Sequence, residues 1–113
     1  MNFVELDANT NLAQQFLEVA EPLVVVNRFV VAPEDEVQVL AAWRQDRDWF
    51  SQQPGFVSAR LIKGVAGSHT YMNFAEWQSS TDFRTAVSKP EVRTFTEKYP
   101  ANVIESLHLF CDA

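Results

Sequence analysis

The sequence predicts a single α+β domain in which helices cover one face of an antiparallel sheet. Two observations support this class. Segments rich in β-branched and aromatic residues alternate with amphipathic segments, and proline, glycine or serine marks most of the changes between them. The expected order is strand, helix, strand, strand, helix, strand, which is the split βαβ pattern of the ferredoxin-like fold.

The first half of this pattern lies between two prolines, Pro22 and Pro54. Leu23 to Val31 is rich in β-branched residues and predicts a central strand. Pro33 suits the first position of a helix, and the acidic residues that follow it suit the positive end of the helix dipole. We expect this helix to end near Gln52. Its apolar stripe consists of Val39, Leu40, Trp43 and Phe50.

The second half begins with a hairpin. Residues 56–62 and 69–77 are two β-rich segments joined by a loop with two glycines, which predicts antiparallel pairing. Ser79 or Ser80 can cap the next helix, and Pro90 can open a further helical piece. These two helices and the last strand are expected at residues 81–87, 90–99 and 103–111. The predicted sheet therefore has four strands, all antiparallel.

Residues 1–21 are expected to form a helical extension in front of the main domain, which spans residues 22–113. An apolar stripe within residues 9–20 predicts a short amphipathic helix there. Asn9 or Thr10 can cap this helix, and Pro22 can stop it.

The second face of the sheet has no helix to cover it, yet its expected side chains are too apolar for water. Two such faces can bury each other in a symmetric pair. The sequence therefore predicts a homodimer packed sheet to sheet. The residues assigned to this face are Val24, Val26, Val30, Val57, Leu61, Met72 and Phe74.

Composition excludes several classes of partner and location. Fifteen acidic against nine basic residues give a net charge of -6, and no Lys/Arg cluster exists, so nucleic acid and anionic membrane surfaces are not expected partners. The longest apolar stretches are far short of the roughly twenty residues that a membrane helix needs. Cys111 has no partner for an internal disulfide, and no secretion signal is visible at the start. We expect a soluble, cytoplasmic protein.

One strand carries an unusual row of side chains. Because side chains alternate along a strand, one of its faces carries His69, Tyr71, Asn73, Ala75 and Trp77. An amide flanked by aromatic rings on a buried face predicts a small pocket for a flat, partly polar molecule. Asn27 interrupts the apolar first strand and could face the same pocket, because a buried amide needs partners. No metal site is expected, since neither His forms part of a zinc-type spacing.

Five short pieces of sequence carry a resemblance to a known family. They are Val25-Val26-Asn27-Arg28-Phe29, Trp43, Gln53-Pro54-Gly55-Phe56-Val57-Ser58-Ala59, Asn73-Phe74-Ala75-Glu76-Trp77 and Lys89-Pro90-Glu91-Val92-Arg93. In this order and spacing, over about residues 22–112, the sequence resembles the antibiotic biosynthesis monooxygenase family.

The resemblance implies a dimeric α+β barrel and a chemistry. Members that act on anthrones oxidise an electron-rich aromatic compound with dioxygen, without a metal or another cofactor. Asn73 and Trp77 match the pocket residues that assist oxygenation in such members. Ile62 and Phe83 stand where the best-known members carry a His and a Tyr, so they are expected to bind substrate but cannot move a proton.

Proton transfer is therefore expected from other groups. His69 and Tyr71 share the face of Asn73 and are the natural substitutes, because general acid–base catalysis contributes roughly 10²–10⁴-fold. The sequence thus predicts a cofactor-independent monooxygenase of a small anthrone, phenol or quinol. Its expected catalytic residues are Asn73, Trp77, Tyr71 and His69, and its expected substrate-binding residues are Asn27, Ile62 and Phe83.

Two alternatives remain open at this point. The same dimer could bind a small metabolite without catalysis, or it could be an isomerase that uses His69 or Tyr71 but no oxygen. Haem degradation, known in the same superfamily, is disfavoured. Asn27 matches the Asn of the haem-degrading members, but Ala86 and Thr96 stand where those members carry a Trp and the axial His.

Overall fold

The computed structural model describes residues 1–113 and confirms the ferredoxin-like class. The body of the sheet consists of four antiparallel strands: β2 (Leu23–Val30), β3 (Phe56–Lys63), β4 (Thr70–Trp77) and β5 (Ile104–Phe110). Their order in the sheet is β5-β2-β4-β3, so the apolar first strand of the pattern lies inside, as its composition predicted.

A fifth strand, β1 (Asn2–Phe3), pairs in parallel with β5, so the predicted count of four strands was wrong. The reason lies at the edge of the sheet. An edge strand exposes unpaired backbone groups, and here Asn2 N donates to Val103 O at 2.7 Å while Val4 N donates to Glu105 O at 2.8 Å. A two-residue strand leaves too little pattern in a sequence to be predicted.

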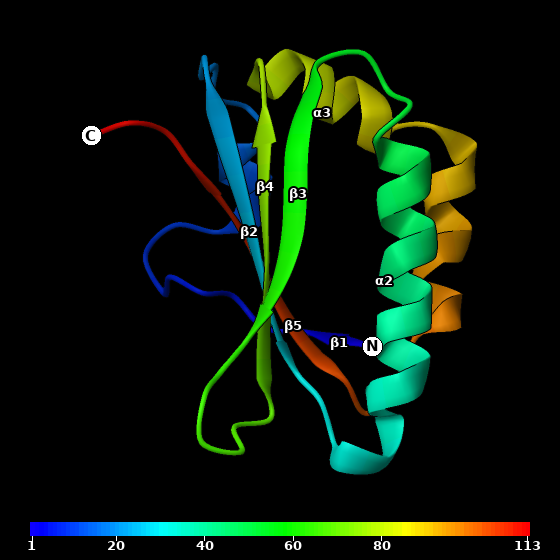
Figure 1. Ribbon diagram of the computed structural model, residues 1–113. Coiled ribbons are helices and arrows are strands. Elements are labelled where there is room, and N and C mark those ends of the chain that lie inside the picture. Colours follow the sequence, from blue (N-terminus) through cyan, green and yellow to red (C-terminus); the bar gives the residue numbers. More distant parts are fainter.

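The helices that follow β2 in the chain lie on one side of the sheet (Figure 1). A short 3-10 turn, η1 (Pro33–Asp35), leads into α2 (Glu36–Phe50), which is the longest helix. The connection after β4 forms α3 (Ser80–Val87), and Ser79 caps this helix by accepting from the backbone N of Asp82. A 3-10 helix, η2 (Pro90–Lys98), follows it. None of these helices combines the length and apolar character needed to cross a bilayer.

The N-terminal helix is shorter than predicted. Only α1 (Leu12–Gln15) is helical, and its cap is Asn11, which forms a capping box with Gln14. The residues after this turn make tertiary contacts with α3. Phe16 stacks on Phe83 with ring centroids 5.9 Å apart, and Ala20 N donates to Ser80 Oγ at 2.9 Å. These contacts hold the segment against α3, and the short helix predicted within residues 9–20 is limited to residues 12–15.

The two faces of the sheet differ, and we call the face toward α2, α3 and η2 the inner face. The alternation predicted for β4 is present: Tyr71, Ala75 and Trp77 are buried, whereas Phe74 and Glu76 are exposed on the outer face. Leu61 was assigned to the outer face, but its register opposite Asn73 puts it on the inner one. A β-bulge between Phe56 and Ser58 changes the alternation at the start of β3, which the sequence pattern did not reveal.

Candidate active site

A cavity of about 230 Å³ lies between the inner face of the sheet and the helices α2, α3 and η2. Trp77 forms its end wall, with its ring 5.4 Å from that of Phe56, 5.5 Å from that of Phe83 and 6.1 Å from that of Phe50. Edge-to-face and tilted packing of this kind fixes the rings in place. The walls are mostly apolar, which suits a small aromatic ligand and excludes water from its reactive atoms.

Asn73 supplies a hydrogen-bond donor to this cavity. Its Oδ1 accepts from the indole Nε1 of Trp43 on α2 at 3.0 Å, so the orientation of the amide is fixed by a residue of another element. No protein atom accepts from Nδ2 of Asn73, although this side chain lines the cavity. The amide N–H is therefore available to an oxygen atom of a ligand.

Asn27 and Glu105 form a second polar pair on the same wall. Asn27 is the direct cross-strand neighbour of Asn73, and its Nδ2 donates to Glu105 Oε2 at 2.9 Å. Burial raises the pKa of Glu105, and the hydrogen bond from Asn27 offsets this only in part. Both residues line the cavity, so a carboxylate lies among aromatic rings.

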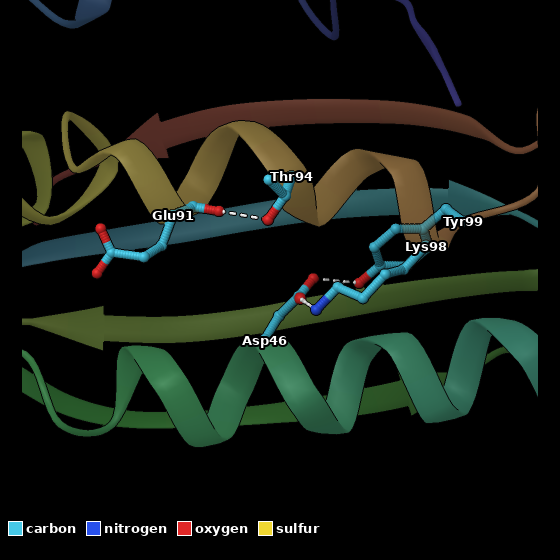
Figure 2. A network of polar contacts seen from close by, with 5 residues as sticks. All are labelled: Asp46, Glu91, Thr94, Lys98 and Tyr99. Atoms are coloured by element: carbon cyan, nitrogen blue, oxygen red, sulfur yellow. Dashed lines mark hydrogen bonds and ion pairs between the residues drawn. The ribbon is translucent and has the colours of Figure 1, made fainter.

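Asp46 lies on the helix side of the cavity and joins α2 to the end of η2 (Figure 2). Its Oδ1 accepts from Lys98 Nζ at 2.8 Å and its Oδ2 accepts from the hydroxyl of Tyr99 at 2.7 Å. Burial raises the pKa of Asp46 even though both hydrogen bonds oppose this change. Burial and the neighbouring Asp46 carboxylate raise the pKa of Tyr99 as well. Since both oxygens of Asp46 have partners, we assign it to holding the cavity together.

Replacing Tyr99 by phenylalanine is expected to lower the free energy of unfolding by about 1–3 kcal/mol, because a buried carboxylate oxygen loses its donor. Urea denaturation at pH 7 measures this change. Tyr71→Phe is the matched control: the Tyr71 hydroxyl makes no hydrogen bond of good geometry, and the nearby Glu36 and Lys63 pair with each other, so its removal should cost less. Equal losses in the two variants would contradict the bracing role of Tyr99.

The structure brings four of the predicted site residues together and leaves three apart. Asn27, Asn73, Trp77 and Phe83 all line the cavity. Tyr71 faces inward and packs with Val31 and Val39, but it does not line the cavity. His69 is exposed just before β4, and Ile62 is 41% exposed on the outer face. None of these last three lies along the cavity.

Three residues of the site were not predicted from the sequence: Trp43 as the group that orients Asn73, and the two carboxylates Asp46 and Glu105. For Glu105 a signal was present in the sequence. Glu105, Leu107 and Leu109 are spaced two residues apart in β5 and therefore share one face, so a carboxylate lies on an apolar inward face. Asp46 lies in a run of charged residues that is typical of the solvent-exposed face of a helix. Its position in the cavity became visible only from its hydrogen bond with Tyr99.

Comparison with known proteins gives a consistent result. The family model described as antibiotic biosynthesis monooxygenase matches residues 22–98. Deoxynogalonate monooxygenase from Streptomyces nogalater is 33% identical over 73 residues, which amount to 63% of this chain and 59% of that protein. The match thus spans less than two thirds of that relative.

Two solved structures illustrate the similarity in three dimensions. SnoaB, a cofactor-independent oxygenase from Streptomyces nogalater, superposes with a TM-score of 0.75 at 26% identity, over 83% of this chain and 95% of that one. A haem-degrading protein from Mycobacterium tuberculosis superposes with a TM-score of 0.61 at 22% identity, over 80% and 90% of the two chains. The latter similarity concerns the fold alone.

Proposed function

Because the chain belongs to the antibiotic biosynthesis monooxygenase family, we propose that it is a cofactor-independent monooxygenase that oxidises a small, electron-rich aromatic compound with dioxygen. One observation supports the substrate class: Trp43 holds the Oδ1 of Asn73, which leaves the amide N–H at the wall of an aromatic cavity free to donate to a ligand oxygen. An anthrone or phenol offers both the flat rings and the oxygen that such a wall can hold.

The reaction needs only substrate and dioxygen. A carbon between two aromatic rings loses one hydrogen as a proton, and the resulting carbanion gives electrons to dioxygen as a C–O bond forms. The peroxide takes up a proton. Loss of the second C–H proton with cleavage of the O–O bond then yields a ketone and one water molecule.

The protein stabilises the charge that develops in this sequence. When the substrate is deprotonated, negative charge moves to its ring oxygen, where the Nδ2 of Asn73 can donate a hydrogen bond. A donor that is already oriented in a dry site is worth about 2.7–4 kcal/mol in the transition state. The Trp77 ring is 2% exposed and its indole N–H has no protein acceptor, so it both excludes water and offers a second donor.

Oxygen consumption tests this proposal. Purified protein, with no added metal or flavin, is mixed with a panel of anthrones, phenols and hydroquinones in an oxygen electrode, and products are identified by mass spectrometry in ¹⁸O₂. Incorporation of one labelled atom per product supports the monooxygenase. Tight stoichiometric binding without oxygen uptake would instead establish a binding protein, and rearrangement of substrate without oxygen uptake would establish an isomerase.

The outer face of the sheet supports a homodimer as the working form. Several large apolar side chains of this face are exposed, which is unusual for a surface in contact with water. They are Val30, Val57, Ile62, Phe74, Ile104 and Phe110. A second copy of the chain can cover them sheet to sheet with two-fold symmetry.

Phe74→Glu is expected to convert the dimer into a monomer, because it places a charge in the middle of the proposed contact. Sedimentation velocity at micromolar concentrations measures the change. Val37→Glu is the matched control, since Val37 is 82% exposed on α2, away from the sheet. Sedimentation of the unaltered protein as a monomer would contradict the dimer.

A further inference from the structure

The cavity holds two carboxylates, and only one of them has an oxygen free to accept a proton. Both oxygens of Asp46 already accept hydrogen bonds, from Lys98 and Tyr99. Glu105 accepts one bond, from Asn27 to its Oε2, and its Oε1 has no hydrogen-bond partner in the protein. Glu105 can therefore take a proton without losing a contact that holds the cavity together.

The place of Glu105 on the wall suits a role in substrate activation. Asn73, on β4, is paired with Asn27 on β2, and Asn27 is paired with Leu107 on β5, two residues from Glu105. Neighbouring strands lie about 4.8 Å apart and each residue rises about 3.3 Å along a strand, so the Cα atoms of Asn73 and Glu105 are about 12 Å apart across one wall. Asn27 lies between them, and its hydrogen bond holds the Glu105 carboxylate. A flat molecule lying along this wall can contact the donor at one end and the carboxylate at the other.

We propose that Glu105 is the general base of the reaction and that Asn27 is the positioning residue that holds its carboxylate. The inference rests on the proposed oxygenase function and names a group for its first step. The Oε1 of Glu105 takes the proton of the acidic C–H or O–H group, the bonding electrons stay on the substrate, and Asn73 stabilises the anion. Dioxygen then accepts electrons from this anion, and Glu105 returns the proton to the peroxide oxygen.

The surroundings of Glu105 adjust its basicity. Burial raises the pKa of the Glu105 carboxyl, which makes its ionised form a stronger base than an exposed glutamate. The N-terminal amino group lowers the same pKa. The other titratable or charged side chains around the cavity are Tyr99, which follows η2, and Asp46 and Arg47, which lie on α2.

Glu105→Gln keeps the size of the side chain and an oxygen that can accept from Asn27, so the variant is expected to fold. Burial of the ionised carboxylate costs stability at every pH above the raised pKa, and this cost disappears when the group is protonated. The variant should therefore melt a few degrees higher than the unaltered protein at pH 8. The difference should shrink as the pH falls through the raised pKa of Glu105 and should be absent below the ordinary range of a glutamate.

Proton abstraction can be measured apart from oxidation. Anthrone that is deuterated at its acidic carbon is mixed with the protein under argon, and loss of deuterium to solvent is followed by mass spectrometry. Glu105→Gln should slow this exchange at least 100-fold, while the Kd for anthrone changes less than threefold. In air, kcat/KM of the unaltered protein should fall at acid pH, because protonated Glu105 cannot accept a proton. This fall should be absent in Glu105→Gln. Glu97→Gln, an exposed glutamate of η2, is the matched control and should behave like the unaltered protein.

Deuterium exchange and oxygen uptake distinguish the proposal that Glu105 is the general base from the proposal that the protein is an oxygenase. Exchange that depends on Glu105, without oxygen uptake, supports the base and overturns the oxygenase function. Oxygen uptake that survives in a folded Glu105→Gln variant, with unchanged exchange and an unchanged pH profile, overturns the base and leaves the oxygenase standing. Absence of catalysed exchange from the unaltered protein across the substrate panel also overturns the base.

Discussion

Replacing Asn73 by alanine is expected to lower kcat/KM for the oxidation of an anthrone by about 10²–10³-fold, the loss seen when one oriented donor is removed from a site of charge development. The expected physical cause is specific. The Oδ1 of Asn73 is held by Trp43, so its Nδ2 meets the developing anion without having to reorient. Initial rates of oxygen uptake over a range of substrate concentrations measure the loss.

Asn73 also has a structural role, because its removal leaves the indole N–H of Trp43 without an acceptor. A second variant separates the two roles. Asn73→Asp keeps an acceptor for Trp43 but has no N–H to donate, so it should lose activity as severely as the alanine variant. Asn102→Ala, in the exposed turn before β5, is the matched control and should keep full activity. If the activity of the aspartate variant is within twofold of that of the unaltered protein, Asn73 serves only as the hydrogen-bond acceptor of Trp43.

Replacing Trp77 by alanine is expected to lower the free energy of unfolding by about 3–5 kcal/mol, the range for large aromatic residues in cores. Trp77 is 2% exposed and its ring meets those of Phe50, Phe56 and Phe83, which come from three different elements. Its removal therefore opens a hole where α2, β3 and α3 meet. For a domain of this size, the melting temperature should fall by about 10–20 °C.

Trp49→Ala is the matched control for this stability change, because Trp49 packs against Phe50 and Phe95 but is only half-buried. Its loss should be clearly smaller. Trp77→Phe keeps an aromatic ring at the end of the cavity but removes the N–H, so its stability and activity can be compared separately. Near-normal stability of Trp77→Ala would show that the end wall can collapse and would contradict its role as the anchor of the cavity.

Much of the fold could be predicted because it follows from local patterns. The hairpin of β3 and β4 was visible in two β-rich segments around glycines, and the strand–helix–strand order left few topologies open. The errors occurred where non-local contacts decide the outcome. Phe16 packs on Phe83, which ended the predicted N-terminal helix early, and a bulge beside Phe56 moved Leu61 to the inner face.

The candidate site divides in the same way. Asn73 and Trp77 were predicted from the alternation of β4, since a polar group on a buried face is a local signal. His69 and Tyr71 were predicted to lie beside them because they share that alternation. In the structure His69 is exposed and Tyr71 packs with Val31 and Val39 beyond the lining of the cavity, because a strand is longer than the cavity that it borders.

Local patterns were enough to predict the order of the elements and the strand that carries Asn73, because periodicity and turn residues act over a few positions. The resemblance to the family rested on five short motifs. Which polar groups face one another follows instead from the packing of elements that are distant in the sequence. The bond from Trp43 to Asn73 spans 30 positions of sequence, and that from Asn27 to Glu105 spans 78. Such contacts depend on how α2 and β5 pack against the central strands, and no local pattern encodes that packing.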